Sequence, residues 1–92
     1  HVFNFPNPFA FETQFTFELT ADAEVSVDIY TLEGRRIKSI PTDYFSIGYH
    51  PIAWDGRDEY GGLLANGVYI YKMTAADGIQ TINHIGRLAV FR

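Results

Sequence analysis

The residues best suited to do chemistry are three carboxylates in a glycine-rich stretch: Asp55, Asp58 and Glu59. Carboxylate oxygens are ligands that Ca²⁺ prefers, but the spacing differs from that of an EF-hand loop, where oxygens come at alternate positions before a distant glutamate. Alternatively, Asp55 and Gly56 form a turn, and Asp58 accepts hydrogen bonds from nearby backbone N–H groups. The pattern favours the turn, and a calcium site is the second interpretation.

Other arrangements that support catalysis or metal binding are missing from the sequence. His1, His50 and His84 lie far apart, without the short spacings at which histidines bind a metal. The chain has no cysteine, and no serine lies in a nucleophile elbow such as G-x-S-x-G. A chain of 92 residues also leaves little room for a deep pocket. We therefore expect a non-catalytic domain without a metal or cofactor.

The composition indicates one compact domain. Apolar residues make up 47% of the chain and aromatic residues 16%, which is enough for a single core. The net charge is −4 and the seven basic residues are scattered, which argues against a surface that binds nucleic acid. No run approaches the ~20 apolar residues of a transmembrane segment, and no signal peptide is present. Because the chain begins with His1 rather than Met, we expect residues 1–92 to be one domain cut from a longer protein.

The alternation of apolar and polar residues predicts β-strands. Residues 14–20 and 24–31 each place apolar side chains on one face, which is typical of half-buried antiparallel strands. Gly34 is placed for a turn with positive φ before the next strand. The clearest hairpin spans residues 68–85, around Asp77-Gly78, a dipeptide favoured in type I′ turns.

Two long loops separate these strands. One is expected at residues 41–51, between Pro41 and Pro51, and the other at residues 57–67; a short strand carrying Trp54 lies between them. No segment has convincing helical periodicity. About seven short strands with turns between them predict an antiparallel β-sandwich of immunoglobulin-like type. An up-and-down barrel is the alternative, although the long loops suit connections between two sheets better.

The N-terminal run "FNFPNPFAF" is rich in aromatic residues. It is typical of an edge strand that Pro6 and Pro8 end, with its rings capping the core. The alternative is a platform on which carbohydrates stack. That alternative predicts that glycan binding fails when Phe9, Phe11 or Tyr60 is replaced.

The chain ends on "HIGRLAVFR", which reads as an apolar strand between two arginines. Leu88 and Val90 share a face that we expect in the core, and Gly86 is placed for a β-bulge. If this strand lies at a sheet edge, a partner can pair with it by β-augmentation. Arg87 and Arg92 would then each offer a fork that grips a carboxylate. The simpler interpretation is a last strand with no further role.

Four stretches together resemble the FlgD-like immunoglobulin folds, and most of all the C-terminal sorting domains of the bacterial type IX secretion system. They are "FPNPF", "VDIYTLEGRRI", "WDGRDEYGGLLANGVYIYKM" and the basic and apolar ending, and the resemblance extends from Asn4 to Arg92. The positions that match the family's structural motifs are Pro6, Asn7, Pro8, Phe9, Gly34, Arg35, Trp54, Asp55, Gly56, Gly67, Val68 and Tyr69.

The resemblance implies a non-catalytic signal at the C-terminus of a secreted protein. Such domains direct their parent through the outer-membrane translocon to the cell surface or medium, where a sortase often removes them. The residues that match the family's translocation signal are Gly86, Arg87, Leu88, Ala89, Val90, Phe91 and Arg92. Many sorting domains have a lysine near the start of this tail, where this chain has Arg87.

Two other functions stay open at this point. The flagellar hook-capping protein FlgD shares the fold and much of the "WDG…G" core, yet it acts as a scaffold, and fold alone does not determine function. An adhesive or carbohydrate-binding sandwich attached to an extracellular enzyme is the third hypothesis. The tail favours the sorting domain over both.

Overall fold

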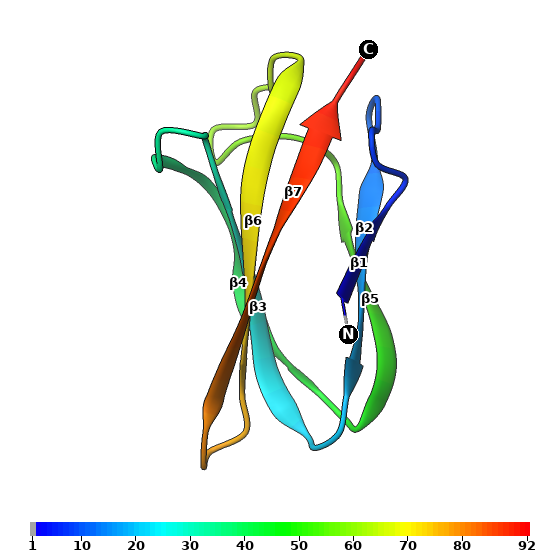
Figure 1. Cartoon of the computed structure of the whole chain (residues 1–92), viewed down its shortest axis with the longest axis vertical. Helices are drawn as coiled ribbons and strands as arrows, with labels where there is room; N and C mark the ends of the chain where they lie inside the picture. Colours follow the sequence, from blue (N-terminus) through cyan, green and yellow to red (C-terminus); the bar gives the residue numbers. More distant parts are fainter. Residues whose placement is uncertain (1) are drawn as a thin grey trace.

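The computed structural model describes residues 2–92, which form two antiparallel β-sheets packed face to face (Figure 1). One sheet has three strands in the order β1-β2-β5, and the other has four in the order β4-β3-β6-β7. The strands are β1 (Val2–Phe5), β2 (Thr13–Leu19), β3 (Ala23–Tyr30), β4 (Arg36–Phe45), β5 (Gly48–Trp54), β6 (Gly67–Ala76) and β7 (Thr81–Val90). The predicted immunoglobulin-like sandwich is confirmed, and the barrel alternative is wrong because none of the strands β1–β7 pairs with a strand of the other sheet.

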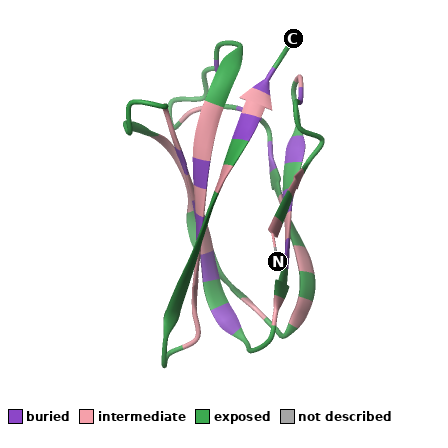
Figure 2. Cartoon of the chain, in the orientation of Figure 1, coloured by how far each residue is buried: buried purple, intermediate pink, exposed green. Residues whose placement is uncertain are grey.

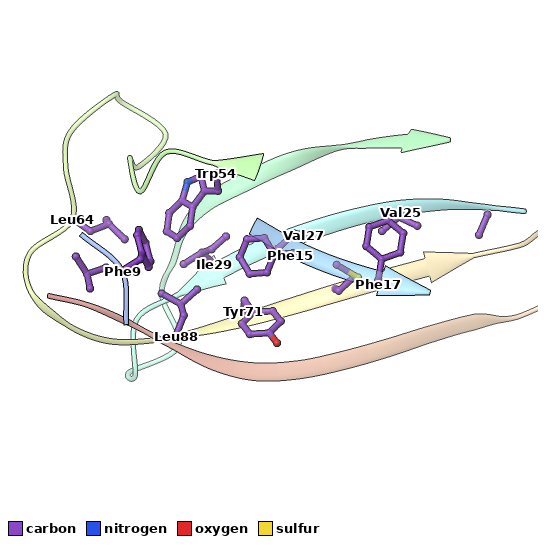
Figure 3. Packing of buried hydrophobic residues seen from close by; sticks show 13 residues of the cluster. Phe9, Phe15, Phe17, Val25, Val27, Ile29, Trp54, Leu64, Tyr71 and Leu88 are labelled. Atoms are coloured by element: carbon purple, nitrogen blue, oxygen red, sulfur yellow. The ribbon is translucent and has the colours of Figure 1, made fainter. Parts of the chain in front are cut away.

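The core lies between the sheets and follows from the alternation in the sequence. Burial alternates along β2 and β3, which place Phe15 and Phe17 opposite Val25, Val27 and Ile29 (Figures 2 and 3). These strands are consecutive but lie in different sheets, so the connection between them crosses the sandwich. Among residues 2–92, no helix is long and apolar enough to span a membrane.

The loop expected at residues 41–51 is wrong, because most of this segment is extended. Strand β4 continues to Phe45, and β5 already begins at Gly48. Pro41 and Pro51 fit because both strands lie at sheet edges, where a missing N–H does not break the ladder. A register shift between β3 and β4 next to Pro41 also absorbs the irregularity. Pro41 and Pro51 therefore lie in edge strands and do not bound a loop.

The hairpin between β6 and β7 is confirmed, but its turn is centred one residue later than predicted. Ala76 pairs with Thr81, and the N–H of Asp77 donates to the carbonyl of Gln80 at 3.2 Å. Gly78 has a φ of 92°, and among residues 2–92 positive φ occurs at glycines alone. Positive φ at one central residue alone is incompatible with a type I′ turn, which needs it at both. A type I′ turn on Asp77-Gly78 would have required positive φ at the aspartate.

The β-bulge expected at Gly86 is also wrong. The pairing of β6 with β7 runs from one end to the other without a register shift. Gly86 lies opposite Tyr71, and a Cβ added there would be 2.5 Å from the tyrosine ring. The glycine therefore makes room for a ring that lies over the backbone of β7. Burial of that ring raises the pKa of Tyr71 above its ordinary value of 10.0.

Candidate recognition site at the C-terminal tail

The C-terminal tail, residues 86–92, has one face in the core and another in solvent. Leu88 and Val90 are 1% and 2% exposed, as their alternation predicts. Arg87, directly before Leu88, is exposed, and Phe91 beyond the strand is 72% exposed. The same few residues thus combine two buried anchors with side chains that a partner can reach.

The N-terminal motif, residues 6–9, pairs with this tail. The N–H of Phe9 donates to the carbonyl of Ala89 at 3.0 Å, and the N–H of Phe91 donates to the carbonyl of Phe9 at 2.9 Å. The side-chain amide of Asn7 donates to the carbonyl of Arg87 and accepts from the N–H of Ala89, both at 3.0 Å. Asn7 therefore bonds to the edge of β7 as a neighbouring backbone would.

This pairing corrects the idea that the tail offers an open edge to a partner. Residues 7–9 run beside β7 and form a parallel bridge from Phe9 to Val90. The outward N–H and C=O groups of Ala89 are therefore already bonded within the domain. A partner can read the exposed side chains of the tail, but it cannot add a strand there without displacing residues 7–9.

The last residue, Arg92, is anchored from several sides. Its N–H donates to the side-chain oxygen of Asn66 at 3.1 Å, and the amide of Asn66 donates back to the Arg92 carbonyl at 3.4 Å. The guanidinium donates to the carbonyl of Leu64 and lies 5.3 Å from the ring centre of Phe11, a cation–π contact. Sequence reasoning missed Asn66, because an asparagine before Gly67 reads only as a turn.

The central motif, residues 54–56, forms a floor beneath this arrangement. Trp54 is buried, its indole N–H donates to the carbonyl of Arg57 at 3.1 Å, and its ring centre lies 5.6 Å from that of Phe9 (Figure 3). Gly56 has a φ of 72°, and a Cβ added there would be 3.0 Å from the Phe9 ring and 3.7 Å from the Arg92 guanidinium. A glycine is required here by both conformation and space.

The other motifs divide between the tail and the opposite edge of the sheet. Residues 67–69 at the start of β6 pair directly with Leu88, Ala89 and Val90. Gly34, at a φ of 93°, closes the turn from β3 to β4, where the N–H of Arg35 donates to the side chain of Thr31. Strands β3 and β6 separate that turn from β7. The "GR" turn is therefore not part of the tail site.

The three carboxylates of the glycine-rich loop each accept hydrogen bonds from backbone N–H groups, two of them within the loop. Asp58 accepts from the N–H groups of Tyr60 and Gly62 at 2.9 Å, and Asp55 accepts from that of Arg57 at 3.1 Å. Glu59 accepts from the N–H of Ser39 on β4. The turn interpretation is confirmed for Asp55 and Asp58. Within the described chain, no group of three or more possible ligands is arranged to hold a metal ion.

The histidines have separate surroundings. His1 lies outside the described residues. The ring of His50 lies near the rings of Phe17 and Phe45, and its Nε2 is 2.6 Å from the carbonyl of Ser46. The ring of His84 lies 6.0 Å from that of Tyr71. The two described histidines therefore lie among aromatic rings, not beside each other.

The three aromatic residues expected to bind glycans do not form one platform. Phe9 is 3% exposed and belongs to the core, Phe11 lies beneath the Arg92 guanidinium, and Tyr60 is 98% exposed in a different loop. The edge-strand interpretation is confirmed for β1, which lies at the edge of its sheet beside β2. Of the rings in the run, Phe9 packs on Trp54 in the core, whereas Phe3, Phe5 and Phe11 are exposed. The prolines also do not end pairing, because residues 7–9 bond to β7.

The fold and motifs define an immunoglobulin-like domain, and the comparisons identify its family. A family model of the FlgD Ig-like domain matches residues 7–78, more than half of the chain. The chain therefore belongs to the FlgD Ig-like family. The tail lies beyond the matched residues. The comparison with curated proteins found no match.

Three solved structures resemble the chain. The dimeric latent PorU of Porphyromonas gingivalis matches with a TM-score of 0.82 and 26% identity, over 97% of this chain and 9% of PorU. FlgD of P. aeruginosa matches with a TM-score of 0.71 and 20% identity, over 85% of this chain and 60% of FlgD. PorZ, an essential surface component of the type IX secretion system of P. gingivalis, matches with a TM-score of 0.62 and 23% identity, over 99% of this chain and 11% of PorZ. The chain thus spans a small part of PorU and PorZ.

Proposed function

We propose that residues 1–92 form a C-terminal signal domain that directs export of its parent protein through the outer membrane by the type IX secretion system. An outer-membrane translocon and a surface sortase recognise it, and the parent reaches the cell surface or the medium. The domain itself is non-catalytic, as its membership in an Ig-like family supports. The parent contributes whatever activity the whole protein has.

The observation that carries this proposal is the conformation of the tail. The side chains of Arg87 and Phe91 are exposed, whereas those of Leu88 and Val90, next to them in the chain, are fully buried. Residues 7–9 on one edge and β6 on the other hold this part of β7 in place. The backbone that carries these side chains is therefore ordered before a receptor binds, which lowers the entropy that binding costs.

Two likenesses add to this argument. The motifs from Pro6 to Arg92 resemble those of type IX sorting domains, and the basic and apolar ending lies outside the part shared with the FlgD family model. The domain fold recurs in PorZ, a surface component of that secretion system, and in PorU of the same bacterium, at the highest TM-score of the three structures above. The hook-cap scaffold has the shared fold and the family motifs of residues 7–78 in its favour, but not the tail.

Surface display of a reporter tests the proposal. The 92-residue chain is fused behind a soluble reporter with a signal peptide, in a cell with a working type IX system. Deletion of residues 87–92 is a poor test, because it also removes Leu88 and Val90 from the core. The informative variants are Arg87→Ala and Phe91→Ala, which remove exposed groups and leave the core intact.

The matched control is Arg36→Ala, which removes an exposed arginine from β4 in the same sheet. We expect the parent fusion and this control to reach the surface, and the two tail variants to be retained, with equal resistance to protease in all four. Retention of the folded parent fusion in the periplasm would overturn the proposal. Normal display of a double Arg87→Ala, Phe91→Ala variant would show that these two side chains are not part of the signal.

A further inference from the structure

The half of β7 far from the tail has an open edge. Residues 7–9 cover the edge only at residues 87–91. The residues before this segment, Val2–Phe5, lie in the other sheet, because β1 pairs with β2. Residues 81–86 of β7 therefore have β6 on one side and, within the described part of the chain, no strand on the other (Figure 1).

The backbone of this half is oriented to accept a strand. The N–H and C=O of Ala89 and the C=O of Arg87 point to the outer edge of β7, where residues 7–9 bond them. Backbone groups alternate in direction along a strand, and the pairing with β6 continues without a shift. The N–H and C=O groups of Asn83 and Ile85 therefore face the same edge and can continue the ladder.

Beside this edge lies an apolar cleft of about 290 Å³ between the two sheets. Phe17 and Leu19 of β2 line one wall, and Met73 and Ala75 of β6 line the other. Ile82 also lines it, on the face of β7 that turns toward the core, yet it is 57% exposed. The sandwich is thus unfilled at the place where a further strand would put alternate side chains into it.

The charges around the cleft indicate which charge a binding partner would carry. Its lining includes two carboxylates, Glu18 and Asp77, and within the described residues neither lysine nor arginine lines it. Neither carboxylate forms an ion pair with a described residue. Hydrogen bonds from the N–H groups of Gln80 and Ile79 lower the pKa of Asp77, so it is ionised at neutral pH. An occupant with a basic side chain at this end would complement that charge.

We propose that the open edge at residues 81–86 and the cleft beside it bind an extended segment of a partner protein, with apolar side chains at alternate positions and a lysine or arginine near one end. The segment adds a strand to β7 and places its apolar side chains against Ile82 and Met73. This proposal does not depend on the export role, since the backbone groups that it uses, those of Asn83 and Ile85, lie before the tail.

A peptide titration followed by amide NMR tests it on the 92-residue chain. The probe is a peptide of about ten residues in which valine and threonine alternate, with lysines at both ends. We expect saturable shifts at the amides of Asn83 and Ile85 and at the residues of the cleft. The same peptide with glutamates at its ends should bind at least about fivefold more weakly at low salt, because the carboxylates of Glu18 and Asp77 repel it.

Two matched variants separate the cleft from the strand surface. Ile82→Ser and Ile85→Ser change the same residue type on the same strand, at 57% and 67% exposure, but only Ile82 lines the cleft. Ile82→Ser should weaken binding at least about fivefold, and Ile85→Ser less than about twofold. Absence of saturable shifts, shifts centred on residues 87–91, or equal effects of the two variants would overturn the proposal. So would shifts that depend on protein concentration without peptide, which would assign the edge to a second copy.

Discussion

At the tail, the types of two single residues, Asn7 and Gly86, decide how neighbouring segments pack. Asn7 bonds to β7 with both atoms of its side-chain amide, so one asparagine replaces a stretch of paired backbone where two prolines flank it. Gly86 does the reverse, because its missing side chain makes room for the ring of Tyr71. Both residues were named from family motifs, and the structure supplies the physical reason that each is of its type.

Replacing Asn7 tests its part in holding the tail. Asn7→Ala removes two hydrogen bonds and leaves the N–H of Ala89 without a partner in the domain. We expect a loss of about 1–2 kcal/mol in the free energy of unfolding, measured by urea denaturation. Asn83→Ala is the control, because the side chain of that exposed asparagine accepts only from Thr74 and bonds no backbone. Equal losses in the two variants would contradict the role of Asn7.

Gly86→Ala tests the close approach of the tyrosine ring. The added methyl group would lie 2.5 Å from ring atoms of Tyr71, so the ring must move. We expect a loss of about 1–3 kcal/mol. In a background of Tyr71→Val the same change should cost much less, because the ring is gone. A double-mutant cycle measures this difference directly, and additive losses would show that the ring is not the obstacle.

At the scale of elements, local patterns predicted the strands, and longer-range pairings decided the rest. The alternation in residues 14–20 and 24–31 gave β2 and β3, because burial on one face imposes a period of two. Pro41 and Pro51 suggested a loop, since a local pattern does not distinguish an edge strand from a loop. The hydrogen bond from Asn7 to Arg87 joins residues 80 positions apart, which no local pattern reports.

The turn between β6 and β7 makes stability depend on pH. The carboxylate of Asp77 accepts from the N–H groups of Gln80 at 2.9 Å and Ile79 at 2.8 Å, which lowers its pKa below the ordinary 3.8. A lowered pKa in the folded state adds stability above the ordinary value, and this is lost as the pH falls through the folded value. Asp77→Ala should therefore lower Tm at neutral pH, with a difference that shrinks below pH 3.8.

Asp77→Asn is the control for that pH dependence. The amide oxygen of the asparagine still accepts the two hydrogen bonds, but the side chain does not titrate. The Tm of this variant should therefore exceed that of the alanine variant by a similar amount at every pH. The measurement is thermal unfolding by circular dichroism from neutral to acid pH. A gap between the native chain and Asp77→Ala that stays constant through acid pH would contradict the role of the charged carboxylate.

The whole molecule is a sandwich that is closed at one end and open at the other. At the tail, residues 7–9, the floor at residues 54–56 and the anchored Arg92 join the two sheets. At the far end the sheets leave a cleft between β2 and β6, beside the uncovered half of β7. One strand thus belongs to both ends, and its two halves meet different surroundings.

Hydrogen exchange along β7 distinguishes these two halves. The amides of Ile85 and Ala89 are compared because alternation directs both to the outer edge of the strand. The N–H of Ala89 is bonded to Asn7 at 3.0 Å, whereas that of Ile85 faces the open edge. We expect exchange at Ala89 to be at least about tenfold slower, because its hydrogen bond must open first. Asn7→Ala should bring Ala89 close to the rate of Ile85 without changing Ile85. If the two amides of the native chain exchange equally slowly, something covers the edge at residues 81–86, and the sandwich is closed at both ends.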